Sequence, residues 1–471
     1  MESNPSAETP TASNDRPPKR GDVIDLTIED WGDKGKGIAR HGRIVVLTDR
    51  GLPGDRVRVR IQGRRKRFLH GAVTEILEPS PDRVDPPCRH FGLCGGCRLQ
   101  DLAYPRQLQD KVRHLKEQIR RIGGETEVPD VEAIGCEPPY HYRNKMEFSF
   151  GGTAGAGLEL GLHPRDNFRD VFNLMECHLT DPRVSRVVEA VRRFFAGGNE
   201  APYHPVAHTG FLRFVVVRIG FNTGDLLVNL VTADAPWPRS REFASFLKDT
   251  CPEITTALWT TNPTRANVAT GTVQTIYFGP GSLREKLGPF EFEIAPTGFF
   301  QTNTRQAERL FQTVVEWATG DGTGEVLDLY SGAGAISLFL SRRAARVIGV
   351  EIHEESVEAA RRNARRNGID NCEFLVADAL AYLREHAAKG TLPATVVLDP
   401  PRAGLHPKAV RTLIETRPAR IICVSCNPPA FARDWESLRR PFKLTRLAAV
   451  DMFPHTPHVE AVACLQWRDP A

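Results

Sequence analysis

The sequence of 471 residues lacks the features of a membrane or secreted protein. No run approaches the roughly 18 consecutive apolar residues that a membrane-spanning helix needs. The first 20 residues are rich in serine, threonine, asparagine and proline, and they contain no apolar stretch of the kind found in signal peptides. We therefore expect a disordered leader over residues 1–20, a cytoplasmic location and no membrane partner.

The chain also lacks a strong excess of charge, since its formal net charge at pH 7 is +4. Overall charge therefore says little about a polyanionic partner. Basic residues do cluster locally, with seven arginines and lysines in the segment 56–67. This density is expected of a phosphate-binding surface, although charge runs also occur on solvated strands. We predict that Arg64, Arg65 and Lys66 contact a nucleic acid.

The first structured segment, residues 21–80, contains short strand-like runs separated by turns rich in glycine, proline and aspartate. The runs are Val23–Ile28, Arg43–Leu47, Arg56–Ile61 and Leu69–Leu77. Four short strands predict a small barrel. The segment Gly35–Arg40, the turn Gly51–Asp55 and the arginine-rich run that follows resemble a TRAM domain, an OB-like RNA-binding module.

The length of the chain indicates about three domains. The second, over residues 81–300, contains an amphipathic basic segment at Leu102–Ile122 that predicts a helix, followed by several apolar or alternating runs that predict an α+β domain. These runs are Lys145–Phe150, Phe211–Phe221, Leu226–Thr232 and Thr272–Phe278. We place Arg143 and Lys145 on the first strand, where they would face RNA or lie on a solvated edge.

Ten cysteines are present, and in a cytosolic chain we expect no structural disulfides. Cys88, Cys94 and Cys97 lie close together in a glycine-rich loop. Thiolates this close repel one another unless a cation or a cluster neutralises them, which indicates a metal centre. Zinc and a 4Fe–4S cluster would each need a fourth soft ligand, for which Cys177 is a better candidate than Cys136. The spacing does not separate zinc from iron.

From about residue 305 the sequence alternates strands and helices, as in a doubly wound parallel sheet. Val326–Tyr330 predicts a strand, Ser331–Gly334 a tight turn and Ile336–Arg342 a helix. The next strand, Arg346–Val350, ends at Glu351, where a carboxylate can accept hydrogen bonds from the ribose hydroxyls of a nucleoside.

The glycine turn favours S-adenosylmethionine over a dinucleotide. It reads Gly332-x-Gly334-x-x-Ser337 and therefore lacks the third glycine of the dinucleotide fingerprint. The third strand, Cys372–Val376, is followed by Asp378, which is well placed to bind an adenine amino group.

Two further strands end in chemically distinctive residues. Ala394–Leu398 leads into Asp399-Pro400-Pro401-Arg402, and Ile421–Ser425 leads into Cys426, after which two prolines prevent the strand from continuing. Five residues would thus share the edge at which parallel sheets bind ligands. Each acid alone could be a helix cap and the thiol a core residue, but their common edge favours a site. The five are Tyr330, Glu351, Asp378, Asp399 and Cys426.

Together these segments resemble the RNA uracil-C5 methyltransferases that act on ribosomal RNA or on the tRNA T-loop, over Gly21 to Trp467. The motifs are Phe299–Asn303, Asp328–Gly334, Asp399–Arg402, Ser425–Pro428 and His455–Glu460. The resemblance implies a multidomain α/β protein. Its parts would be a TRAM OB-like barrel over residues 21–80, a central α+β domain with an Fe–S cluster over 81–300 and a Rossmann-like class I methyltransferase domain over 301–471.

The resemblance also implies roles for individual residues. Cys426 would be the nucleophile, Glu460 the general base and Phe299 the stacking partner of a displaced base. The S-adenosylmethionine pocket would comprise Gln301, Tyr330, Glu351, Asp378 and Asp399, and the 4Fe–4S ligands would be Cys88, Cys94, Cys97 and Cys177. One departure is Ala335, where relatives often carry asparagine, and it leaves one cofactor contact in question.

The chemistry explains why these residue types are needed. Uracil C5 is a poor nucleophile until a thiolate adds to C6 and creates an enolate, and a base must later remove the C5 proton. An amine methyltransferase would need no Cys426 and usually follows its Asp-Pro-Pro turn with an aromatic residue, where this chain has Arg402. A non-catalytic RNA-binding protein would not need both Cys426 and Glu460. We expect a monomer acting on 23S ribosomal RNA, with the tRNA T-loop as the alternative substrate.

Overall fold

The computed structural model describes residues 17–320 and 324–468, so most of the predicted leader lies outside the described residues. The chain divides into two compact units, residues 1–85 with 98–103 and residues 86–97 with 104–471. This division into two units does not decide the domain boundaries predicted after residues 20, 80 and 300, which remain predictions.

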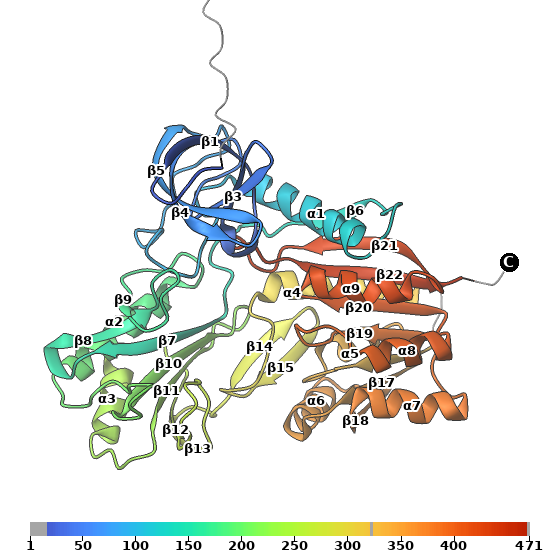
Figure 1. The fold of residues 1–471 in the computed structure, drawn as a ribbon. Coiled ribbons are helices and arrows are strands. Elements are labelled where there is room, and N and C mark those ends of the chain that lie inside the picture. Colours follow the sequence, from blue (N-terminus) through green and yellow to red (C-terminus); the bar gives the residue numbers. More distant parts are fainter. Residues whose placement is uncertain (1–16, 321–323, 469–471) are drawn as a thin grey trace, which may run out of the picture. The chain divides into compact units, whose positions relative to one another are not determined.

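The first unit contains a closed five-stranded barrel, in the order β1-β2-β3-β5-β4 (Figure 1). Side chains alternate between its inside and its surface, so that Val57, Val59 and Ile61 are buried while the intervening residues are not. The barrel confirms the predicted fold, and β2 is the strand that the sequence did not indicate. The strands are β1 (Val23–Trp31), β2 (Gly37–His41), β3 (Ile44–Thr48), β4 (Arg56–Arg65) and β5 (Phe68–Glu78).

The second unit begins with a seven-stranded sheet in the order β13-β12-β11-β10-β7-β8-β9. Helices α2 (Pro182–Ala196) and α3 (Ser240–Thr250) pack against it through an aromatic core that includes Phe195, Trp237 and Phe243. The strands are β7 (Lys145–Gly152), β8 (Leu158–Leu162), β9 (Phe172–Asn173), β10 (Leu212–Ile219), β11 (Leu226–Ala233), β12 (Thr256–Asn262) and β13 (Val273–Phe278). A separate hairpin follows, formed by β14 (Leu283–Leu287) and β15 (Phe290–Ile294).

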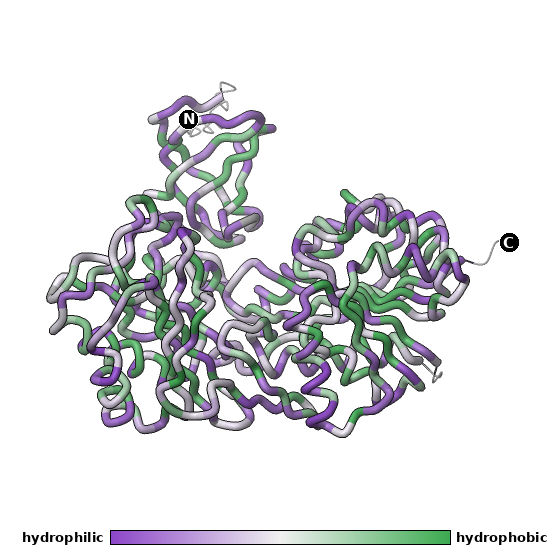
Figure 2. The backbone as a smooth tube through the Cα atoms, turned by 90° about the horizontal axis from the view of Figure 1, so that it is seen from below, coloured by the Kyte–Doolittle hydropathy of each residue, from purple (hydrophilic) through white to green (hydrophobic). Residues whose placement is uncertain are grey.

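An eight-stranded sheet forms the C-terminal part, in the order β18-β17-β16-β19-β20-β22-β21-β6. The five strands from β18 to β20 are parallel, and β22 runs antiparallel between β20 and β21. Figure 2 shows hydrophobic positions concentrated along these strands, whose residues form the core. The strands are β16 (Glu325–Leu329), β17 (Arg346–Glu351), β18 (Cys372–Val376), β19 (Thr395–Leu398), β20 (Arg420–Ser425), β21 (Phe442–Val450), β22 (Glu460–Trp467) and β6 (Val131–Ile134).

Helices cover both faces of this sheet, as expected of a doubly wound fold. One core contains residues of α4 (Thr304–Thr319), α5 (Ala335–Leu340) and α6 (Glu354–Arg366). The other contains residues of α1 (Tyr104–Arg121), α7 (Ala379–Lys389), α8 (Pro407–Thr416) and α9 (Pro428–Leu438), the last three of which are visible side by side in Figure 1. Among the described residues, no helix combines the length and apolar character needed to cross a membrane.

Two elements reach this sheet from much earlier in the chain. Strand β6 extends the sheet by pairing in parallel with β21, and helix α1 contributes Leu115 and Ile119 to its core. Both lie within the range 81–300 that the sequence assigned to a central domain. The eight-stranded sheet is therefore completed by residues that precede the middle sheet in the chain.

Candidate active site

The carboxyl ends of five parallel strands bring together the residues that the sequence placed at one edge. Tyr330 follows β16, Glu351 ends β17 and Asp378 follows β18. Asp399 follows β19 and Cys426 follows β20. Because these strands are adjacent and parallel, all five residues lie along the same edge of the sheet.

Cys426 lies in the turn between β20 and α9 and is half-buried. Asn427 has an extended conformation (φ −136°, ψ 84°) and Pro428 opens α9, as expected for a proline at the first helical position. The Asn427 side chain donates a hydrogen bond of 2.8 Å to the carbonyl of Arg402. This bond ties the cysteine turn to the Asp-Pro-Pro-Arg loop on the neighbouring strand.

Glu460 approaches the Cys426 turn from β22, which runs antiparallel to β20. It is the first residue of β22, whose antiparallel register pairs Ala461 with Ser425 of β20. Glu460 is only 5% exposed, and burial together with the charge of Asp399 raises the pKa of its carboxyl to about 8, against a lowering effect of Arg402. Because its pKa is raised, the ionised Glu460 carboxylate is a stronger base than that of an ordinary glutamate.

The charges of Glu460, Asp399 and Arg402 also affect the pKa of the Cys426 thiol. Burial raises the pKa of its thiol, the charges of Glu460 and Asp399 raise it further, and Arg402 lowers it. Burial also raises the pKa of Asp399 to about 6. The site thus concentrates two carboxyl groups and a thiol around one arginine, and that arginine favours the thiolate.

The glycine turn after β16 has the backbone conformation expected of a cofactor loop. Gly332 (φ 53°) and Gly334 (φ 83°) are in the left-handed region, and so is Tyr330 (φ 66°), where a side chain is strained. A Cβ atom at Gly334 would lie 2.9 Å from Ala360 and 3.0 Å from Phe374. The turn therefore needs glycine both for its conformation and for its packing.

Glu351 fastens this turn from the neighbouring strand. Its carboxylate accepts hydrogen bonds from the backbone N–H of Gly332 (3.2 Å) and of His353 (2.9 Å). Each carboxylate oxygen has a second lone pair, so the group can still accept bonds from a ligand. Asp378 is exposed and caps α7 by accepting a 2.9 Å bond from Ala381. Asp378 therefore acts as a helix cap through one carboxylate oxygen, and its second oxygen can still accept a hydrogen bond.

The segment before α4 carries the two remaining predicted residues. The Phe299 side chain is 78% exposed, whereas the adjacent Phe300 is buried against Phe292. The backbone carbonyl of Gln301 accepts a 2.9 Å bond from the Asn144 side chain, and Gln301 is half-buried. An exposed phenylalanine beside a fixed backbone is well suited to stack on a planar ring.

A buried polar network holds the loop 451–459 that leads to Glu460. Lys111 of α1 and Asp451 are both fully buried and form an ion pair of 2.7 Å, and Lys111 also donates to the carbonyl of Phe453. The side chain of Gln107 bonds both the backbone and the ring of His455. His455 has φ 65°, so this loop also contains a strained residue.

Sequence reasoning missed this network, although a signal was present. The buried residues of α1 include the stripe Gln107, Lys111, Leu115 and Ile119, in which each residue is four positions after the last. A glutamine and a lysine at core positions of an amphipathic helix indicate buried polar contacts.

The four cysteines assigned to a metal centre are gathered in the second unit. The charges of Cys177, Cys94 and Cys88 all raise the pKa of Cys97, in addition to burial, so the four thiols lie within electrostatic range of one another. Cys136 contacts the side chain of Asn303, and Cys97 and Cys177 pack against the same small core cluster as Cys136, so the assignment of Cys177 as the fourth member remains a prediction. In the described part of the chain, no group of three or more cysteine, histidine or acidic side chains is arranged to hold a metal ion.

Arg143 and Lys145, which we predicted to contact RNA, have different surroundings in the structure. Arg143 precedes β7, and its charge lowers the pKa of Cys97 and Cys177, so it lies beside the cysteines. Lys145 pairs with Glu147 at 2.6 Å. Strand β7 begins at Lys145, so the expectation that Arg143 is on this strand was wrong. Lys145 pairs with Arg218 of β10, whereas β8 pairs only with Ser149–Gly152. The choice between an RNA-facing position and a solvated edge remains a prediction.

The basic segment of the barrel divides into paired and unpaired residues. Arg56 and Arg58 form ion pairs with acids of β1 and β5. Arg64, Arg65 and Lys66 are exposed at the β4–β5 hairpin, and none forms an ion pair with another described residue. These three residues remain available for a phosphate group.

Comparison with known proteins identifies the two parts of the chain. Residues 17–74 match the TRAM domain, and residues 282–468 match the tRNA (uracil-5-)-methyltransferase family. An RNA methyltransferase of Chlorobaculum tepidum is 38% identical, with 95% of this chain and 97% of that protein covered. One of Nitratidesulfovibrio vulgaris is 39% identical, with 94% and 96% covered.

A solved structure is similar over almost the whole chain. It is that of the Pyrococcus abyssi tRNA (uracil-54, C5)-methyltransferase in complex with S-adenosyl-L-homocysteine. The TM-score is 0.75 and the identity 32%, with 94% of this chain and 99% of that chain covered. The chain therefore belongs to the family of S-adenosylmethionine-dependent RNA (uracil-C5) methyltransferases with a TRAM domain.

Proposed function

We propose that the chain methylates C5 of a uridine in an RNA loop through a covalent adduct between Cys426 and C6 of the base. The observation that carries this proposal is the junction of β20 and β22, which sets the Cys426 thiol and the buried Glu460 carboxyl within electrostatic range of each other. In this proposal the Cys426 thiol forms the adduct, and the Glu460 carboxyl removes the proton that allows the adduct to be resolved.

The reaction has a defined sequence of bonds. The Cys426 thiolate adds to C6, and the electrons of the C5–C6 double bond move into the uracil ring as an enolate. C5 then takes the methyl group that S-adenosylmethionine supplies. The Glu460 carboxylate removes the C5 proton, the double bond re-forms and the Cys426 thiolate leaves. A base with a pKa near 8 is matched to this proton transfer at neutral to slightly alkaline pH.

We propose that the cofactor lies along the strand ends from Asp378, after β18, to Asp399, after β19. The spare lone pairs of Glu351 would accept bonds from the ribose hydroxyls, and the free oxygen of Asp378 would accept a bond from the adenine amine. Gln301, from the segment before α4, would complete this pocket. The target base would leave its stack and lie against Phe299, and stacking of this kind contributes about 1–3 kcal/mol.

For the substrate we propose large-subunit ribosomal RNA, supported by the TRAM domain together with the four-cysteine set. The second candidate is the T-loop uridine of tRNA, which the similarity to the Pyrococcus abyssi enzyme favours. Mapping 5-methyluridine in total RNA from cells with and without the enzyme distinguishes them. Loss of the modification from 23S ribosomal RNA alone supports the first candidate, and loss from tRNA alone supports the second.

We also propose that Cys88, Cys94, Cys97 and Cys177 bind a 4Fe–4S cluster. The charges of Cys88 and Cys94 raise the pKa of both Cys97 and Cys177, so the four thiols are a suitable donor set, because metal coordination neutralises charges that otherwise repel. Anaerobic purification should yield about four irons and four sulfides per chain, the stoichiometry of such a cluster. Stoichiometric zinc would refute the assignment.

Two variants test the covalent mechanism. Cys426→Ala should abolish methyl transfer while RNA binding persists, whereas Cys423→Ala, which alters a buried thiol of the same strand, should keep its activity. Glu460→Gln should accumulate a denaturation-resistant adduct with RNA, because the C5 proton is not removed. Full activity of Cys426→Ala would refute the mechanism, and recovery of only free, unmodified RNA from Glu460→Gln would refute the base assignment.

A further inference from the structure

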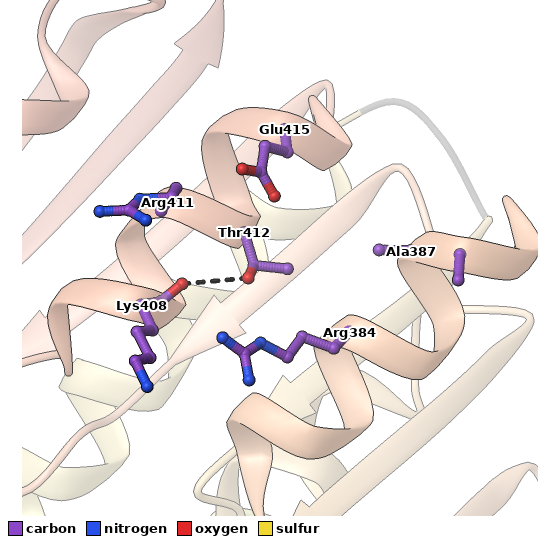
Figure 3. Close-up of a pocket in the computed structure, with 7 residues that line it drawn as sticks. Arg384, Ala387, Lys408, Arg411, Thr412 and Glu415 are labelled. Atoms are coloured by element: carbon purple, nitrogen blue, oxygen red, sulfur yellow. Dashed lines mark hydrogen bonds between the residues drawn. The ribbon is translucent and has the colours of Figure 1, made fainter.

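A hollow of about 400 Å³ lies between helices α7 and α8, outside the site described above. Figure 3 shows Arg384 extending from α7 toward α8, which carries the other polar residues of the hollow. Three of the lining side chains are cationic and one is acidic, which leaves an excess of two positive charges. They are Arg384, Lys408, Arg411 and Glu415.

The three cations are exposed, and none forms an ion pair with another residue that the structure describes. Other exposed cations of the second unit do have acidic partners. Lys389 at the end of α7 pairs with Glu385 at 2.6 Å, and Arg346 of β17 pairs with both Glu325 and Glu373. The hollow therefore collects positive charge that the chain itself does not neutralise.

The hollow extends along both helices to their last turns, at Ala388 and Glu415, and its three cations lie toward the helix starts, nearer the catalytic edge. Helix α7 begins directly after Asp378, and α8 follows the loop that starts at Asp399. Lys408, Arg411 and Arg384 are the second, fifth and sixth residues of their helices. At a rise of about 1.5 Å per residue, all three lie within roughly 10 Å of the helix starts. An RNA strand whose uridine enters the site could thus run along this face.

We propose that Arg384, Lys408 and Arg411 form a phosphate-binding groove that holds the backbone of the substrate RNA beside the catalytic edge. The inference rests on the proposed RNA substrate. Arginine matches phosphate through its planar fork and lysine through its point charge, so this set suits phosphodiester groups without reading a sequence. The groove would add affinity and orientation while leaving the choice of uridine to the active site.

The test is the salt dependence of RNA binding. An Arg384→Gln/Lys408→Gln/Arg411→Gln variant and the wild type are titrated with a labelled, unmodified ribosomal RNA fragment and with a tRNA transcript over a salt series. Three lost phosphate contacts should reduce the slope of log affinity against log salt by about 2, and the affinity at 0.1 M salt by about 100-fold. Glutamine is a good helix former, so the thermal stability should not change.

The matched control removes the same charge from ion-paired positions. Lys389→Gln/Arg346→Gln/Arg186→Gln neutralises three exposed cations that have acidic partners. Its slope should stay close to that of the wild type. In the opposite direction, Glu415→Lys adds a fourth cation to the hollow and should strengthen RNA binding by about 5-fold at 0.1 M salt.

The outcomes separate this inference from the proposed function. Equal slopes for the groove variant and the matched control would overturn the groove, provided that the wild type still produces 5-methyluridine. Absence of 5-methyluridine with the wild type would instead overturn the proposed function. If inorganic phosphate at constant ionic strength binds the wild type but not the groove variant, while RNA binding is equal, the groove is a free-anion site and the RNA proposal is wrong.

Discussion

Replacing Glu460 with glutamine should stabilise the protein, and the gain should increase with pH. The pKa of Glu460 is about 8 in the folded protein, against an ordinary value of 4.5. Below pH 4.5 the carboxyl is neutral in both the folded and the unfolded chain. Between these values the unfolded chain ionises while the folded chain does not, and each pH unit then costs about 1.4 kcal/mol of folding free energy. The loss reaches the order of 3–4 kcal/mol by pH 7.5.

Glutamine has nearly the same shape and does not titrate, so the variant should not suffer this loss. We expect the difference in melting temperature between Glu460→Gln and the wild type to increase by roughly 10 °C from pH 5 to pH 8, since about 1 kcal/mol corresponds to 2–4 °C for a domain of this size. The comparison between the variant and the wild type isolates the titration of Glu460, because every other titratable side chain is present in both proteins.

Thermal melting followed by circular dichroism at several pH values is sufficient for this measurement. Glu436→Gln removes an exposed carboxyl on α9 and serves as the control, with a change in folding free energy of at most about 0.5 kcal/mol at every pH. A difference between Glu460→Gln and the wild type that is independent of pH would refute the reasoning. So would a difference that decreases as the pH rises, because the carboxylate would then be stabilised by the fold.

Three further predictions concern the site and its support. The kcat/KM for methyl transfer should rise with pH to pH 8 or above, because the pKa values of both Glu460 and Cys426 are raised, and a pH–rate profile with saturating cofactor measures this. Lys111→Met should destabilise the protein by about 3–5 kcal/mol in urea unfolding, because Asp451 would be left buried without its partner; a loss below 1 kcal/mol would contradict this role. Phe299→Ala should weaken RNA binding by roughly 5- to 100-fold without changing the affinity for S-adenosylmethionine, and calorimetry with each ligand separates the two effects.

The catalytic edge was predictable because each of its residues is defined by a local pattern. A short apolar strand followed by a distinctive residue appears five times, and the parallel topology then requires a common edge. The two prolines after Asn427 were interpreted correctly as ending the strand. They were not interpreted as the start of α9, although proline at the first helical position is common.

The parts that could not be predicted depend on pairing between distant segments. Strand β6 reaches β21 across more than 300 residues of sequence, and no local pattern in Val131–Ile134 names its partner. Lys111 depends on Asp451 in the same way. Arg143 was placed on the strand that begins the middle sheet, but it precedes that strand and lies beside Cys97 and Cys177, which are distant or separate from it in the sequence.

The basicity of Glu460 is the clearest case of a property that belongs to the fold. In the sequence it is an acid at the start of an apolar run, which a surface position would also explain. In the sheet, β22 lies between β20 and β21, Glu460 is paired opposite Val450, and the residue is buried. Desolvation then raises the pKa by disfavouring the charged form. The same burial that lowers the stability above pH 4.5 also raises the basicity of the carboxylate. If Glu460 removes the C5 proton as proposed, stability and catalysis impose opposite demands on this position.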